Sequence, residues 1–191
     1  MKQYTAIILC LLLLCSVFLV ACSGEPNTSL EKVVMNASWA YNYKNVQELT
    51  EHSDLIAYVS IATMDTYEQN GIVMTKYQAN IVEEIYGEKA RTVEIIMTGG
   101  VVGKTLYEFE DDPLMSAKDE FLIFARKNVS GTYTILSGPQ GRFVVKDDKV
   151  FSLNVALSEV RKASPYSSIY VNGMEKEQFI SQIRDCLKST N

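Results

Sequence analysis

Residues 54–86 have the sequence DLIAYVSIATMDTYEQNGIVMTKYQANIVEEIY, in which two segments rich in β-branched and aromatic residues flank Asn70-Gly71. Asn-Gly between two such segments is the strongest short hairpin signal, because a type I′ turn needs two successive residues with positive φ. We therefore expect a long antiparallel hairpin with Asn70-Gly71 at its tip. A helix through residues 72–86 would contradict this prediction.

The turn also predicts how the two strands pair. Counting outward from it places mostly apolar residues opposite one another: Met64 with Tyr77, Ala62 with Ala79, Ser60 with Ile81 and Ile56 with Ile85. On the other face Asp65 lies opposite Lys76, a favourable cross-strand pair. Leu55, Val59 and Ile61 then fall on the supposedly outer face. The first strand is therefore expected to be either bulged or covered on both sides.

Shorter strands are expected elsewhere, and helices at both ends of the β region. The strands are predicted at residues 92–97, 120–127, 132–137, 142–146 and 149–154, with a tight turn at Asp147-Asp148. A short helix is predicted over residues 45–52, capped by Asn45. A closing helix over residues 174–187, capped by Asn172, carries one apolar stripe: Phe179, Ile180, Ile183 and Leu187. This order predicts a mainly β fold with flanking helices, in which a small antiparallel barrel is followed by a C-terminal amphipathic helix.

Three segments of this region, SDLIAYVSI, YQANIVEEIYGE and VEIIMTGG, follow one another as strand, strand, glycine-containing turn and strand. The succession resembles the OB-type barrel of netrin-like and metalloprotease-inhibitor domains. The resemblance implies an OB-like barrel. Those inhibitors use a free N-terminal cysteine and a disulfide network, which this chain is not expected to have. Their inhibitory chemistry is therefore not carried over.

The N-terminus has the layout of an export signal. One cation, Lys2, precedes residues 6–21, AIILCLLLLCSVFLVA, which contain no charge, Gly or Pro. A membrane-spanning helix needs about 20 apolar residues, and no cations follow this run to stop its transfer. The run is therefore predicted to be a signal peptide.

The run ends in Leu19-Val20-Ala21-Cys22, which resembles the bacterial lipobox. The resemblance implies that the Cys22 thiol is alkylated by diacylglycerol with acyl chains such as palmitate. It also implies that a lipoprotein signal peptidase cuts between Ala21 and Cys22. Two acyl chains then hold the protein on the extracytoplasmic face of the cell membrane. The alternative is an ordinary cleaved signal with a chance cysteine.

The chain is accordingly divided into a signal peptide (1–21), a lipid attachment site and tether (22–44) and a globular domain (45–191). Without Lys2 the chain keeps 17 of its 18 Lys and Arg against 23 Asp and Glu, a net charge of −6. This acidic balance argues against nucleic acid as a partner. Cys10 and Cys15 leave with the signal and Cys22 is blocked, so Cys186 has no disulfide partner.

Three patterns with catalytic or ligand-binding associations are incomplete. Residues 98–105, TGGVVGKT, lack the first glycine of a P-loop, and acids follow them. His52-Ser53-Asp54 holds the residue types of a hydrolase triad, but consecutive side chains cannot align as base and nucleophile. The acids at Glu108, Glu110, Asp111 and Asp112 lack the spacing of a calcium loop. No enzyme activity, cofactor or metal is predicted.

A binding module is the leading prediction, with an envelope protein or peptide as its partner. The alternative is a structural envelope factor without a dedicated ligand. The connection over residues 99–118 is long for a compact domain, and such connections are usually functional or disordered. Its Tyr107, Phe109 and Glu110 are the predicted partner-binding residues, an apolar anchor ringed by acids. The same aromatic residues could instead close the barrel.

Overall fold

The computed structural model describes residues 30–158 and 169–189. The predicted signal peptide, its cleavage site, Cys22 and the polar residues after it lie outside the described residues. Within the described part of the chain, no helix has the length and apolar character to cross a membrane. The fold belongs to one compact unit, Glu31–Asn191.

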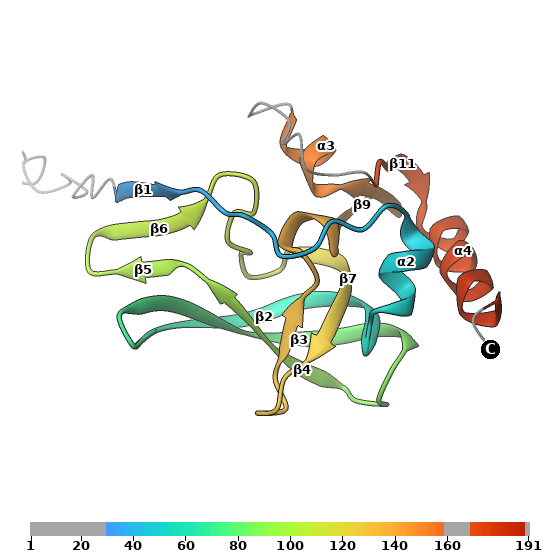
Figure 1. The fold of residues 1–191 in the computed structure, drawn as a ribbon, viewed down its shortest axis with the longest axis horizontal. Coiled ribbons are helices and arrows are strands. Elements are labelled where there is room, and N and C mark those ends of the chain that lie inside the picture. Colours follow the sequence, from blue (N-terminus) through green and yellow to red (C-terminus); the bar gives the residue numbers. More distant parts are fainter. Residues whose placement is uncertain (1–29, 159–168, 190–191) are drawn as a thin grey trace, which may run out of the picture. The chain divides into compact units, whose positions relative to one another are not determined.

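The unit is mainly β, as predicted (Figure 1). Its strands are β1 (Glu31–Met35), β2 (Leu55–Gln69), β3 (Ile72–Tyr86), β4 (Thr92–Thr98), β5 (Gly100–Val102), β6 (Thr105–Phe109), β7 (Glu120–Lys127), β8 (Tyr133–Ile135), β9 (Arg142–Lys146), β10 (Lys149–Ser152) and β11 (Asn172–Glu175). Its helices are α2 (Val46–Glu51), α3 (Leu153–Ser158) and α4 (Lys176–Ser189), with a 3₁₀ turn, η1 (Gly138–Gln140). One sheet has the order β11-β10-β9-β7-β2-β3-β4-β8, and a further pairing between β7 and β8 closes a five-stranded barrel. The predicted small barrel with flanking helices is confirmed.

The central hairpin forms where the sequence predicted it. Asn70 and Gly71 have φ values of 53° and 77°, as a type I′ turn requires. Next to the turn, Met64 pairs with Tyr77 and Asp65 with Lys76, as expected. The two strands of this hairpin, β2 and β3, are two of the five barrel strands.

Further from the turn the three other predicted apolar pairs are wrong. Ala79 lies opposite Ile61 and not Ala62, because the register shifts between Ile61 and Thr63. Two further shifts follow, so the observed partners differ from those expected: Val59 with Ile81, Ser60 with Asn80 and Ile56 with Tyr86. Each bulge places an extra residue in one strand without a partner, and a turn-based count cannot anticipate it.

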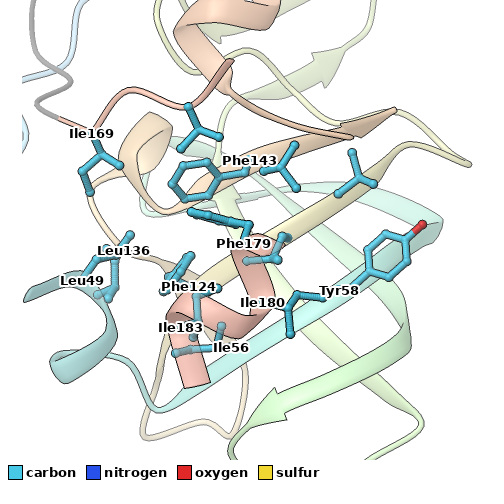
Figure 2. Close-up of a cluster of buried hydrophobic side chains, with 14 of the residues drawn as sticks. Leu49, Ile56, Tyr58, Phe124, Leu136, Phe143, Ile169, Phe179, Ile180 and Ile183 are labelled. Atoms are coloured by element: carbon cyan, nitrogen blue, oxygen red, sulfur yellow. The ribbon is translucent and has the colours of Figure 1, made fainter. Parts of the chain in front are cut away.

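The first half of β2 is both bulged and covered on both faces. Its odd-numbered residues from Leu55 to Ile61 lie in the core enclosed by the barrel, together with Tyr77. Ile56 and Tyr58 point the other way into a second core against α2 and α4, which Figure 2 shows. The apolar residues that looked misplaced on an outer face are therefore buried.

The helices follow the predicted patterns with one correction. Asn45 caps α2, since its side chain accepts a hydrogen bond from the Glu48 N–H at 2.8 Å. Helix α4 buries its predicted stripe in the second core: Phe179, Ile180 and Ile183 fully, and Leu187 in part. The predicted start at residue 174 and the Asn172 cap are wrong. Asn172–Glu175 instead form β11, which pairs with β10 and so extends the sheet to the start of the helix.

The connection over residues 99–118 is more ordered than expected. It contains β5 and β6, and β6 pairs in parallel with β1 to make a separate three-stranded sheet in the order β1-β6-β5 (Figure 1). The strand β1 lies in the segment predicted to be tether. The compact unit therefore begins at Glu31, upstream of the predicted boundary at residue 45.

Candidate functional site

The three predicted site residues are brought to the end of β6. Tyr107 and Phe109 lie two positions apart on the strand, so their side chains share one face of the three-stranded sheet. Both are half-buried, while Glu110 follows the strand and is exposed. The Glu110 N–H donates to the Met35 carbonyl at 3.3 Å, which continues the pairing of β6 with β1. Tyr107 and Phe109 are therefore part of a sheet, and Glu110 directly follows it.

Phe109 contributes to the packing of the unit. Its ring meets the Trp39 indole edge-on, with 5.9 Å between ring centroids. The indole Nε1–H donates to the Asp111 carboxylate at 3.0 Å. The indole also covers Gly138, where a Cβ atom would stand 2.2 to 2.7 Å from three ring carbons. Trp39, which sequence reasoning did not assign, thus joins β6 to the 3₁₀ turn η1.

Two of the four acids are buried, so the predicted ring of acids around an apolar anchor is wrong in part. Glu108 is buried and forms an ion pair with Lys32 of β1, and it also accepts a hydrogen bond from the Leu114 N–H at 3.3 Å. Asp112 is buried against Arg142. Because these carboxylates have internal partners, they hold the connection in place.

Arg142 is the most deeply buried charged side chain near this connection, at 1% exposure. Its Nη2 donates to Asp112 Oδ1 at 2.5 Å and to the Pro113 carbonyl at 2.7 Å. Its guanidinium also lies over the Phe121 ring, 5.1 Å from the centroid. Burial raises the pKa of the Asp112 carboxyl, and the charge of Arg142 opposes that shift. Sequence reasoning missed this pair, because nothing in the residues around position 142 distinguishes an inward from an outward arginine.

The three-stranded sheet presents apolar side chains and an open edge. Four valines on its outer strands are exposed at 38 to 49%: Val33, Val34, Val101 and Val102. Among the residues that the structure describes, β1 has no strand partner other than β6, so it forms an open edge of this sheet. Glu31 and Met35 direct backbone groups toward β6, so by strand alternation those of Lys32 and Val34 point away from it. An edge of this kind can accept another extended strand.

The residues considered for catalysis have other partners. His52 Nδ1 contacts the Glu48 carbonyl oxygen at 2.8 Å, Ser53 Oγ donates to the Leu49 carbonyl, and the Asp54 carboxylate accepts from the Lys127 N–H. The residues of the incomplete P-loop pattern, which follow β4, form β5 and its turn into β6. Among residues 30–158 and 169–189, no group of three or more His, Cys, Asp or Glu is placed to hold a metal ion.

No protein-family model matches the chain, and no curated protein matches it.

Proposed function

We propose that this protein is a bacterial lipoprotein, anchored through Cys22 on the extracytoplasmic face of the membrane, that binds an extended segment of an envelope protein without catalysing a reaction. The proposed binding surface is the edge and outer face of the β1-β6-β5 sheet. The sequence Leu19-Val20-Ala21-Cys22 supports the anchor.

The open edge of β1 is the observation that carries the binding proposal. The backbone N–H and C=O groups of Lys32 and Val34 can pair with a peptide in the manner of strand addition. The exposed Val33 and Val34 offer apolar contacts on the two faces of such a strand, because alternate side chains point to opposite faces. Exposed valines gathered at an unpaired edge are a typical interaction surface.

The position of β1 in the chain fits an anchored receptor. Residues 23–30 separate Cys22 from Glu31, and a fully extended segment of this length reaches at most about 30 Å. The proposed surface would therefore work close to the bilayer. Its partner is expected to be an envelope protein that exposes an extended segment near the membrane.

Metabolic labelling with a fatty acid tests the anchor. Cys22→Ala is expected to abolish labelling and leave an uncleaved or mislocalised precursor, since both lipidation and cleavage depend on that thiol. Cys186→Ala, which removes the half-buried cysteine of α4, serves as the control and should label normally. Label retained in Cys22→Ala would disprove the lipobox interpretation.

Crosslinking in intact cells tests the binding surface. Val34→Asp places a charge on the proposed edge and should reduce co-purification of a stoichiometric partner, without lowering the melting temperature. Val129→Asp is the matched control, because Val129 is fully exposed in the turn between β7 and β8. Equal capture by both variants would show that the partner binds elsewhere. Absence of any stoichiometric partner would favour a structural envelope factor.

A further inference from the structure

The backbone of the β1 edge is complementary to itself. β1 runs from Glu31 to Met35, so Val33 is its midpoint. The backbone groups that point away from β6 belong to Lys32 and Val34, which lie symmetrically on either side of Val33. Opposite residues of two antiparallel strands alternate between pairs that exchange both hydrogen bonds and pairs that exchange none. A two-fold axis at Val33 would therefore place Lys32 and Val34 of each copy in hydrogen-bonded pairs with Val34 and Lys32 of the other.

The side chains of β1 also suit this register. Val33 would lie opposite Val33 of the second copy, an apolar cross-strand contact between side chains that are exposed in the single chain. Lys32 would lie opposite Val34, and no residue of β1 would lie directly opposite one of like charge. A two-fold axis at Lys32 would instead bring two lysines face to face. The charges therefore favour the register centred on Val33.

β1 is weakly protected against pairing with another chain. It contains no proline, and its pairing with β6 has no register shift that would mark a bulge. Its one cation, Lys32, is held in an ion pair with Glu108 of β6. Four of its five residues are exposed, and it is the outermost strand of its sheet (Figure 1). An edge of this kind is open to a strand from a second molecule.

The proposed tether would let two copies meet in this way on one membrane. Their Glu31 residues would lie about 14 Å apart, four residues along the strands and one strand spacing across. Residues 23–30 reach at most about 30 Å, so both Cys22 anchors would reach the same bilayer. Anchoring confines the copies to a thin layer beside the bilayer and raises their effective concentration. A second copy thus has the property expected of the partner, an extended segment close to the membrane.

We propose that the segment bound by β1 is β1 of a second copy, in antiparallel pairing about Val33. The two three-stranded sheets then form one continuous sheet in the order β5-β6-β1-β1-β6-β5. The assembly is a closed dimer, because each β1 edge pairs with the other. This inference rests on the proposed function, since it names the partner of the same edge.

Cysteine crosslinking in membranes tests the pairing and its register. The background is the full-length chain with Cys186→Ala, expressed in two copies that carry different epitope tags. Val33→Cys would bring two thiols to a pair whose Cα atoms are about 4.5 Å apart, which a disulfide can span. Val34→Cys is the matched control, because its two Cα atoms would lie about 7 to 8 Å apart. After mild oxidation with copper-phenanthroline, Val33→Cys should give at least about five times more disulfide-linked dimer containing both tags. The background chain should give none.

The outcomes separate this inference from the proposed function. No dimer from Val33→Cys, or as much dimer from Val34→Cys, would overturn the pairing. If Val34→Asp still reduced capture of a different envelope protein, the proposed function would stand and the second copy would be excluded as the partner. If neither effect appeared, both proposals would fail.

Val34→Pro provides a check that needs no disulfide. Proline removes the outward N–H of Val34 in both copies without removing a hydrogen bond to β6. Co-purification of the two tags from detergent-solubilised membranes should fall at least about fivefold, since two hydrogen bonds between the copies are lost. The melting temperature should be unchanged, because proline is tolerated on an edge strand whose N–H faces solvent. Undiminished co-purification would overturn the proposal.

Discussion

Single buried residues give this fold some of its most testable features. Tyr77 is fully buried at the centre of the barrel, and its hydroxyl oxygen accepts a hydrogen bond from the Met115 N–H at 3.3 Å. Burial raises the pKa of Tyr77 to about 12, since the phenolate would lose its solvation there. The ionisation of one side chain is thereby linked to the stability of the whole unit.

Tyr77 is expected to make the protein sensitive to alkali. Its folded pKa exceeds the ordinary value of 10, so its stabilising contribution is complete below pH 10 and is lost as the pH rises toward 12. A shift of about two pKa units corresponds to about 3 kcal/mol of unfolding free energy. Urea unfolding between pH 9 and 12 should show a steeper loss of stability in the wild type than in Tyr77→Phe. Parallel curves would contradict this linkage.

Gly138 is expected to tolerate no side chain, because Trp39 covers it. Gly138→Ala adds a Cβ within 2.2 to 2.7 Å of the indole ring, at a φ of 50°. Gly103→Ala is the matched control, since Gly103 has a φ of 61° and open space around it. Chemical denaturation should show a loss of about 1 kcal/mol for the control and several times more for Gly138→Ala. Equal losses would mean that Trp39 moves aside at little cost.

At the scale of elements, β6 is held in the fold by side-chain contacts and also belongs to the exposed sheet of the proposed binding surface. One end is held by the Glu108–Lys32 pair and by the contact of Phe109 with Trp39. The strand also joins β1 to β5, whose valines are exposed. The two aromatic residues predicted together as a binding site should therefore respond differently to truncation.

Phe109→Ala is expected to lower the unfolding free energy by about 1 to 3 kcal/mol, less than for a fully buried phenylalanine. Tyr107→Ala should have a smaller effect on stability but should weaken partner capture under the proposed function. Thermal unfolding and crosslinking of the two variants compare these effects. An equal loss of stability in both would assign Tyr107 to the packing of the unit and remove it from the binding surface.

At the scale of the whole molecule, the structure moves the start of the folded unit to Glu31. Two truncated chains test this boundary. A chain that begins at Leu30 loses only the residues before β1 and should melt like the chain that begins at Ser23. A chain that begins at Asn36 loses β1, which leaves the buried Glu108 without Lys32, and should melt at a lower temperature. Equal melting temperatures would restore the predicted boundary at residue 45.

The sequence by itself determined the features that depend on a few neighbouring residues. Asn70-Gly71 and Asp147-Asp148 both adopt the positive φ that a tight hairpin needs, and Asn45 caps α2. The apolar stripe of α4 follows from the helical period. Of the candidate site, the sequence indicated Tyr107 and Phe109 but placed them in a long connection, whereas the structure places them in β6. Local signals of this kind are set by backbone sterics and side-chain periodicity.

Only the tertiary structure decided which distant segments meet. Three long-range contacts join residues about 30 to 100 positions apart. In these contacts β1 pairs with β6, Arg142 is buried against Asp112, and Trp39 covers Gly138. The register beyond Thr63 likewise depends on bulges that let both faces of β2 be buried. Side-chain chemistry alone does not select among such long-range partners. They are selected by the simultaneous packing of the barrel interior and of the core under α4, which lowers the free energy only when every segment is in place.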